Sequence, residues 1–129
     1  MAIANIVQYE TTFKMELLDP LTDKGLGIIF DIRSSESEDC KTVIRKHLDK
    51  LTQLRQKNKP VTAELIERQE LEKVASFVAG WDWGDEEVYE GKGAPEFKLD
   101  NVIDILDKLG WVYSQVSQAA VGLSNFTKA

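Results

Sequence analysis

Apolar and polar residues alternate along two short stretches near the start of the chain. The apolar positions are Phe13, Met15 and Leu17 in residues 12–18, and Leu26, Ile28, Phe30 and Ile32 in residues 26–33. A period of two is typical of strands that bury one face. Between the two stretches, Pro20 fixes its own φ and Gly25 can supply a positive φ, which favours a turn. The pattern predicts a β-hairpin with a long loop.

The period changes from two to between three and four after this hairpin. Ser35 followed by Glu38 matches a capping box, so we expect a helix to start there. Its apolar positions are Cys40, Val43, Ile44, His47, Leu48, Leu51 and Leu54. Pro60 interrupts the pattern, and a second helix is expected from Pro60 or Thr62 to a stop at Gly80. Its inward positions are Val61, Leu65, Ile66, Leu71, Val74, Ala75 and Val78.

Residues 81–98 have no sustained period and are rich in glycine and acidic residues, which predicts a loop. Helical spacing returns at Leu99, with Asp100 or Asn101 as cap and Gly110 as the end. A last helix is expected from Trp111, with Val112, Val116, Ala119 and Leu123 on one face. The fold class predicted is mainly α with a small N-terminal β-hairpin (α+β) and about four helices.

The length fits one domain over residues 1–129. Its parts are a hairpin region (1–34), two long helices (35–80), an acidic aromatic loop (81–98) and a C-terminal helix pair (99–126). With 43% hydrophobic residues, a chain of this size can bury a core without metal or disulfides. The lone Cys40 cannot form an internal bridge, and we expect it to pack as a small hydrophobe.

Charge and hydropathy narrow the classes of partner. No apolar stretch approaches the roughly 20 residues that a membrane helix needs, and the N-terminus lacks the pattern of a signal peptide. A net charge of −6 argues against nucleic acid, because duplex binders cluster Lys and Arg. We therefore expect a cytoplasmic protein whose partners are proteins, with neither membrane nor nucleic acid bound.

The sequence offers little for catalysis or metal binding. His47, the only histidine, lies on an apolar helix face, where a packed residue at the edge of the core is the commoner role and a pH switch the rarer one. One histidine and one cysteine cannot supply a zinc site, and no Walker or dinucleotide motif is present. The acidic residues Asp82, Asp85, Glu86 and Glu90 lack the ligand order of a calcium loop. We expect no catalytic residues, no metal and no cofactor.

Aromatic residues are the unusual feature of the C-terminal half. Trp81, Trp83, Tyr89 and Phe97 lie in or beside the acidic loop, and Trp111, Tyr113 and Phe126 follow it. Tryptophan and tyrosine combine a large apolar area with a polar edge, so they serve both cores and interface hot spots. Several tryptophans near helix ends favour the core role, and the interface role stays open.

The order of these elements resembles that of the tail assembly chaperones of long-tailed, siphovirus-type bacteriophages. The matching pattern in residues 70–126 is Glu70-Leu-Glu-Lys-Val-Ala-Ser-Phe-Val-Ala79, Gly80-Trp81, an acidic loop, Phe97-Lys-Leu-Asp-Asn101-Val102, Trp111-Val112 and Asn125-Phe126. The N-terminal strand, the Asp19-Pro-Leu-Thr-Asp turn, the second strand and the Ser-capped helix also match. One departure is Lys98, where the family often has a Ser or Thr cap.

The resemblance implies a protein of the host cell cytoplasm that binds the tape measure protein, aids tail tube polymerisation and is absent from the finished virion. A longer, frameshifted form would recruit the tail tube protein, and coating an extended partner suggests weak self-association into a homo-oligomer. A groove between amphipathic helices could cover the apolar stripes of the tape measure protein. The residues expected to line or support it are Trp81, Trp83, Phe97, Asn101, Trp111 and Phe126.

Two other classes of function stay open. A structural tail or head-tail connector subunit would be present in virions in stoichiometric amounts. A small ligand-binding domain or enzyme would need a concave pocket with convergent polar groups, which nothing in the sequence requires.

Overall fold

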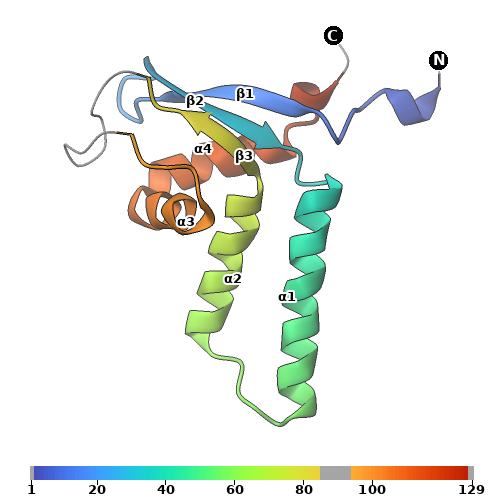
Figure 1. Ribbon diagram of the computed structural model, residues 1–129. Helices are drawn as coiled ribbons and strands as arrows, with labels where there is room; N and C mark the ends of the chain where they lie inside the picture. The colour runs from blue at the N-terminus through green and yellow to red at the C-terminus, as the bar shows by residue number, and fades with distance from the viewer. Residues whose placement is uncertain (1, 85–93, 128–129) are drawn as a thin grey trace.

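The computed structural model describes residues 2–84 and 94–127, which form an α+β fold (Figure 1). The expected fold class is confirmed, with four α-helices in this part of the chain and a sheet of three antiparallel strands in the order β1-β2-β3. The strands are β1 (Thr12–Leu18), β2 (Gly25–Arg33) and β3 (Val78–Asp82). The helices are α1 (Glu38–Gln56), α2 (Ala63–Ser76), α3 (Leu99–Lys108) and α4 (Gly110–Val121), with short 3-10 turns η1 (Ile3–Asn5) and η2 (Leu123–Phe126).

The N-terminal hairpin is confirmed. β1 and β2 pair in register from Thr12↔Arg33 to Leu18↔Gly25, with one irregularity after Glu16. The turn chemistry differs from the expectation, because Gly25 is the first residue of β2 and the positive φ of 58° belongs to Asp23. Asp19 organises this turn, since its Oδ1 accepts hydrogen bonds from the amides of Leu21 and Thr22.

The third strand was not expected. The sequence predicts a helix up to Gly80 and a loop from Trp81, but α2 ends at Ser76 and residues 78–82 pair with β2. Gly80 lies within the strand opposite Asp31 and does not end a helix. Val74, Ala75 and Val78 continue the helical spacing of α2, so periodicity alone could not locate the change. The rest of the expected loop includes residues 85–93, which lie outside the described residues.

The core lies on one face of the sheet. Met15, Leu17, Ile28, Phe30 and Ile32 are buried there, as the alternation predicts. The helices supply the other side of this core, with Val74, Ala75, Val102, Ile103, Ile105, Leu106, Val112 and Val116. The opposite face carries charged residues, including the Lys14–Asp31 ion pair at 2.9 Å across β1 and β2.

The two long helices are confirmed, but the proposed capping box is wrong. α1 begins at Glu38 with Ser37 as N-cap, and the Ser37 side chain makes no capping hydrogen bond. Glu10 takes that role from the N-terminal segment, because its Oε1 accepts the Glu38 amide at 2.9 Å. α2 follows the expectation at its start, since the Thr62 hydroxyl accepts the Leu65 amide at 3.1 Å.

The C-terminal helix pair is confirmed, but the residues that cap and end its helices differ from those expected. The N-cap of α3 is Lys98, without a side-chain cap bond, so neither Asp100 nor Asn101 caps it. Gly110 is the first residue of α4, because α3 already ends at Lys108. On α4, Val112, Val116 and Ala119 are buried as expected. Leu123 lies in η2 and is 57% exposed, so it does not extend that face into the core.

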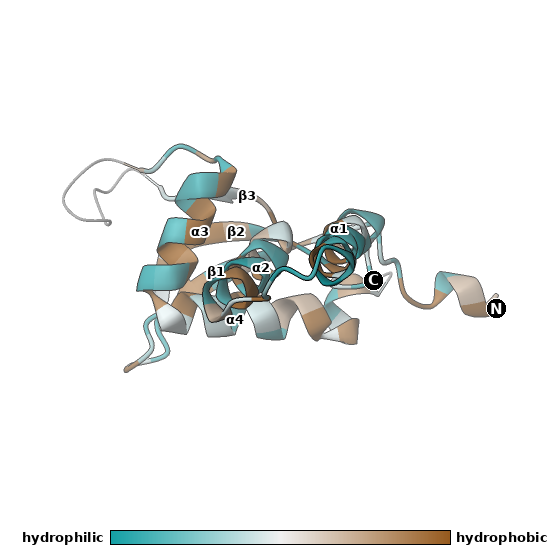
Figure 2. Cartoon of the chain, turned by 90° about the horizontal axis from the view of Figure 1, so that it is seen from below, coloured by the Kyte–Doolittle hydropathy of each residue, from teal (hydrophilic) through white to brown (hydrophobic). Residues whose placement is uncertain are grey.

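The helices α1 and α2 form an antiparallel arm, residues 38–76, that projects away from the sheet (Figure 1). α2 lies between α3 on one side and α1 on the other (Figures 1 and 2). Cys40 is the only buried residue of α1, so most of this helix packs against α2 alone. Within the described residues, no helix is long and apolar enough to cross a membrane.

Candidate protein-binding groove

A hollow of about 390 Å³ lies where the base of the arm meets α3. Its floor is the end of α2 and the start of β3, and its walls come from α1 on one side and α3 on the other. The lining residues are Arg33, Asp39, Val43, Glu72, Ala75, Ser76, Val78, Phe97, Leu99 and Val102. We call this hollow the groove. Six of the ten lining residues are apolar, which suits the burial of apolar side chains from a ligand.

Two of the apolar lining residues are left largely uncovered. Phe97 is 43% exposed and Leu99 is 54% exposed. Val78 and Val102, by contrast, are buried beneath them and belong to the core. An exposed Phe and Leu beside a hollow retain apolar area that a partner can remove from water, worth about 25 cal/mol per Å².

The aromatic residues of the sequence pattern support one wall of the groove. Trp81 meets the ring of Phe97 edge-on, with centroids 5.3 Å apart. Trp81 in turn contacts Trp83 at 5.6 Å and Phe30 at 5.4 Å. Trp83 is buried, and the Trp81 indole N–H donates to the Pro95 carbonyl at 3.1 Å. This cluster fixes the segment that presents Phe97, so Phe97 lines the groove while Trp81 and Trp83 stand behind it.

The other expected site residues have different positions. Asn101 donates from Nδ2 to the Glu96 carbonyl at 2.8 Å and thereby ties the Phe97 segment to α3. Trp111 is half-buried and packs against the core at the start of α4, outside the groove lining. Phe126 is fully buried in η2, and its carbonyl accepts the Gln8 amide. The structure therefore brings together Trp81, Trp83, Phe97 and Asn101, but not Trp111 or Phe126.

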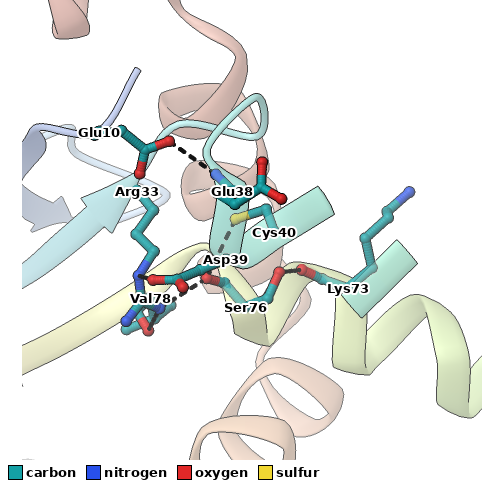
Figure 3. A network of polar contacts seen from close by, with 8 residues as sticks. All are labelled: Glu10, Arg33, Glu38, Asp39, Cys40, Lys73, Ser76 and Val78. Carbon is teal, nitrogen blue, oxygen red and sulfur yellow. Dashed lines mark hydrogen bonds and ion pairs between the residues drawn. The ribbon is translucent and has the colours of Figure 1, made fainter. Parts of the chain in front are cut away.

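A polar network closes the sheet end of the groove (Figure 3). Arg33 donates from Nη1 to the carbonyls of Ser76 at 3.0 Å and Val78 at 3.2 Å, and its Nε lies 3.2 Å from Asp39 Oδ2. Cys40 Sγ donates to the same Ser76 carbonyl at 3.4 Å. One guanidinium thus joins β2, the α2–β3 junction and the start of α1, and it satisfies carbonyls freed where α2 ends.

A weak ion-pair chain reaches the groove through Glu72, the one member of the chain that lines it. Glu72 Oε1 lies 4.0 Å from His47 Nε2 and 3.7 Å from Arg68 Nε, and Arg68 Nη2 lies 3.8 Å from Asp100. These distances are long and the groups are partly exposed, so each pair contributes little to stability. His47 is a core-edge residue, as expected, with 17% of its side chain exposed.

In residues 2–84 and 94–127, no group of three or more His, Cys, Asp or Glu residues could hold a metal ion. Cys40, expected to be a small hydrophobe, is fully buried within the core cluster. Of the acidic residues that lack the order of a calcium loop, Asp85, Glu86 and Glu90 lie outside the described residues.

Sequence reasoning identified Phe97 as a lining residue but missed Arg33, Asp39 and Glu72. Val43, Ala75, Leu99 and Val102 were recognised only as inward positions of separate helices. No local signal says that these positions converge, because the groove exists only after α2, β3 and α3 have packed.

Comparisons with known proteins do not identify the chain. No family model, no curated protein and no solved structure matches it.

Proposed function

We propose that this protein is a tail assembly chaperone whose groove holds an apolar helical segment of a phage tape measure protein. The observation that carries the proposal is the pair of exposed apolar residues, Phe97 and Leu99, beside a mostly apolar hollow of about 390 Å³. The order of strands and helices that resembles this family supports it. The chain would act in the host cytoplasm and leave before the virion is complete.

The physical basis is the temporary covering of apolar surface. A long helical protein that waits for its tube exposes apolar stripes, and uncovered stripes associate with one another. A groove of this volume accommodates roughly two or three apolar side chains from one helix face, which is the helix-in-groove mode of recognition. Such limited contact favours release when tube subunits replace the chaperone.

The test uses Leu99→Glu, which places a charge in the groove at a position already 54% exposed. We expect co-purification with tape measure segments to fall at least about tenfold, because a carboxylate would be desolvated against apolar side chains. The matched control is Leu21→Glu, since Leu21 is 92% exposed in the β1–β2 turn. Equal binding by both folded variants and the parent would reject the groove as the site.

Mass spectrometry of purified virions addresses the connector alternative. A chaperone is expected to be absent, whereas a tail or head-tail connector subunit would be present in fixed stoichiometry. The tail tube protein, through a longer frameshifted form, and further copies of this chain complete the set of partners that we propose.

A further inference from the structure

Positive charge is concentrated on α1 and the turn after it, in an otherwise acidic protein. The chain has 16 Lys and Arg residues against 22 Asp and Glu residues. Within residues 41–59 the only acidic residue is Asp49, while the basic residues are Lys41, Arg45, Lys46, Lys50, Arg55, Lys57 and Lys59. The rest of the chain is therefore strongly negative, and residues 41–59, which are most of α1 and the turn after it, form a separate basic region.

Part of this charge is not neutralised by the protein itself. Lys41 lies 3.7 Å from Glu36 and Arg45 lies 2.8 Å from Glu38, so these two are paired at the base of α1. Lys46, Lys50 and Lys57 are exposed, and none of them forms an ion pair with another described residue. We call these three lysines the cationic stripe.

The cationic stripe continues one wall of the groove. Val43 lines the groove, and the three lysines follow it at positions +3, +7 and +14. These spacings keep residues on one face of a helix. From Val43 to Gln56, the last residue of α1, the helix axis advances about 20 Å at 1.5 Å per residue, and Lys57 follows as the C-cap. A helix seated in the groove and aligned with α1 would therefore pass along all three lysines.

Apolar residues accompany the stripe along the arm. Leu54, on the same face of α1, and Leu65, on α2, are half-buried, and Val61 is 39% exposed. Phosphate backbones offer no apolar surface to match such residues, whereas an amphipathic protein helix does. Charge complementarity then requires acidic side chains beside the apolar stripe of that helix.

We propose that the partner segment is an amphipathic helix with an acidic flank, whose Asp and Glu residues lie on Lys46, Lys50 and Lys57 while its apolar stripe enters the groove. This inference rests on the proposed function, because it assumes a helix in the groove. It adds that this helix carries acidic side chains and that it lies along α1.

The experiment measures binding of three labelled helical peptides to the full chain by fluorescence anisotropy. The first peptide has a leucine stripe flanked by Glu, the second has the same stripe flanked by Lys, and the third has Glu flanks with every Leu changed to Gln. We expect the first to bind about tenfold more tightly than either of the others, since exposed ion pairs contribute up to about fivefold each.

Single charge reversals then locate the contact. Lys50→Glu is expected to weaken binding of the Glu-flanked peptide about two- to fivefold. The matched control, Lys24→Glu, changes the same charge on an exposed lysine in the β1–β2 turn and is expected to leave binding unchanged. The triple variant Lys46→Glu, Lys50→Glu, Lys57→Glu should reverse the preference, so that the Lys-flanked peptide binds more tightly.

The contrary outcomes separate the two proposals. If neither leucine peptide binds better than the Gln peptide, the groove itself is rejected and this inference falls with it. If both leucine peptides bind equally and Lys50→Glu has no effect, the groove stands and the acidic flank is rejected. Equally tight, stripe-dependent binding of a DNA duplex, a phosphatidylserine vesicle or a second copy of the chain would also overturn the acidic helix.

Discussion

At the scale of single residues, the Arg33 side chain of β2 joins its strand to the α2–β3 junction and to α1. Its guanidinium reaches two carbonyls at the α2–β3 junction and the Asp39 carboxylate on α1. Arg33 uses two different nitrogens, Nη1 for the carbonyls and Nε for Asp39, and a lysine, whose donors all lie on one terminal nitrogen, does not reproduce this fork. The partly buried carbonyls of Ser76 and Val78 would then lose charge-assisted hydrogen bonds.

The first prediction follows from this geometry. Arg33→Lys is expected to lower the free energy of unfolding by about 1–3 kcal/mol, as measured by urea denaturation. Lys14→Met serves as control, because the Lys14–Asp31 pair is exposed and should contribute less than about 1 kcal/mol. Equal midpoints for Arg33→Lys and the parent would show that the network does not hold the junction.

A second residue pair gives the protein a defined pH dependence. The Tyr113 hydroxyl donates to Glu70 Oε1 at 2.7 Å, joining α4 to α2. Burial, together with this hydrogen bond, raises the pKa of Tyr113 to about 12. Burial alone would raise the pKa of Glu70, but hydrogen bonds from Tyr113 and Lys73 outweigh it and hold that pKa below 4.5.

The second prediction uses the sign of these shifts. Between pH 10 and 12 the unfolded chain loses the Tyr113 proton while the folded chain keeps it, so stability from this group is lost as pH rises through that window. The Glu70 contribution is instead lost as pH falls below 4.5. Urea midpoints of Tyr113→Phe should fall less steeply from pH 10 to 12 than those of the parent. Parallel slopes for both proteins would contradict the assignment.

At the scale of elements, the two long helices begin in physically different ways. The Thr62 hydroxyl caps α2, whereas the Ser37 hydroxyl at the start of α1 is buried and has no hydrogen-bond partner among the residues that the structure describes. Glu10, from outside the helix, supplies the acceptor for the Glu38 amide. A carboxylate there also interacts favourably with the positive end of the helix dipole.

The third prediction compares the two helix starts by replacing the hydroxyl residue at each of them with alanine. Thr62→Ala should lower the free energy of unfolding by about 1 kcal/mol, because it removes a cap. Ser37→Ala should be neutral or slightly stabilising, because it removes a buried hydroxyl that has no partner. Thermal unfolding of both variants, with Glu10→Ala alongside, checks the assignment. A larger loss for Ser37→Ala than for Thr62→Ala would mean that Ser37 is the true cap.

Periodicity was sufficient to predict the hairpin and the four helices, because each carries apolar residues at a regular spacing. It failed at residues 77–82, where Phe77 and Val78 are buried whether the backbone is helical or extended. The strand forms there because β2 offers a free edge, which is a tertiary cause that propensity cannot show. The capping box predicted for α1 was wrong for a similar reason, since Glu10, which accepts the Glu38 amide, lies far from Glu38 in sequence.

At the scale of the whole molecule, the candidate site was predictable in composition but not in geometry. The aromatic cluster beside Phe97 was visible as a concentration of Trp and Phe. Which of these residues line the groove and which support it depends on the position of β3, because the strand places Trp81 and Trp83 behind Phe97. Trp111 and Phe126 shared the pattern but pack elsewhere, because large aromatic residues also serve the core of a small domain.

The contrast between the arm and the sheet leads to the fourth prediction. α1 has 19 residues but buries only Cys40, whereas β2 buries Ile28, Phe30 and Ile32. Regions with few buried apolar contacts open at low free energy. In hydrogen exchange followed by mass spectrometry, amides of residues 50–56 should therefore exchange at least about tenfold faster than those of β2.

A partner helix that lies along the arm should remove this difference. Adding the Glu-flanked leucine peptide is expected to slow exchange in residues 50–56 and leave β2 unchanged, because a helix that opens must first release its ligand. The triple charge-reversal variant of the cationic stripe provides the control, since it should retain fast exchange with the same peptide. Protection confined to residues 97–102 in the parent would place the peptide in the groove alone and exclude contact along the arm.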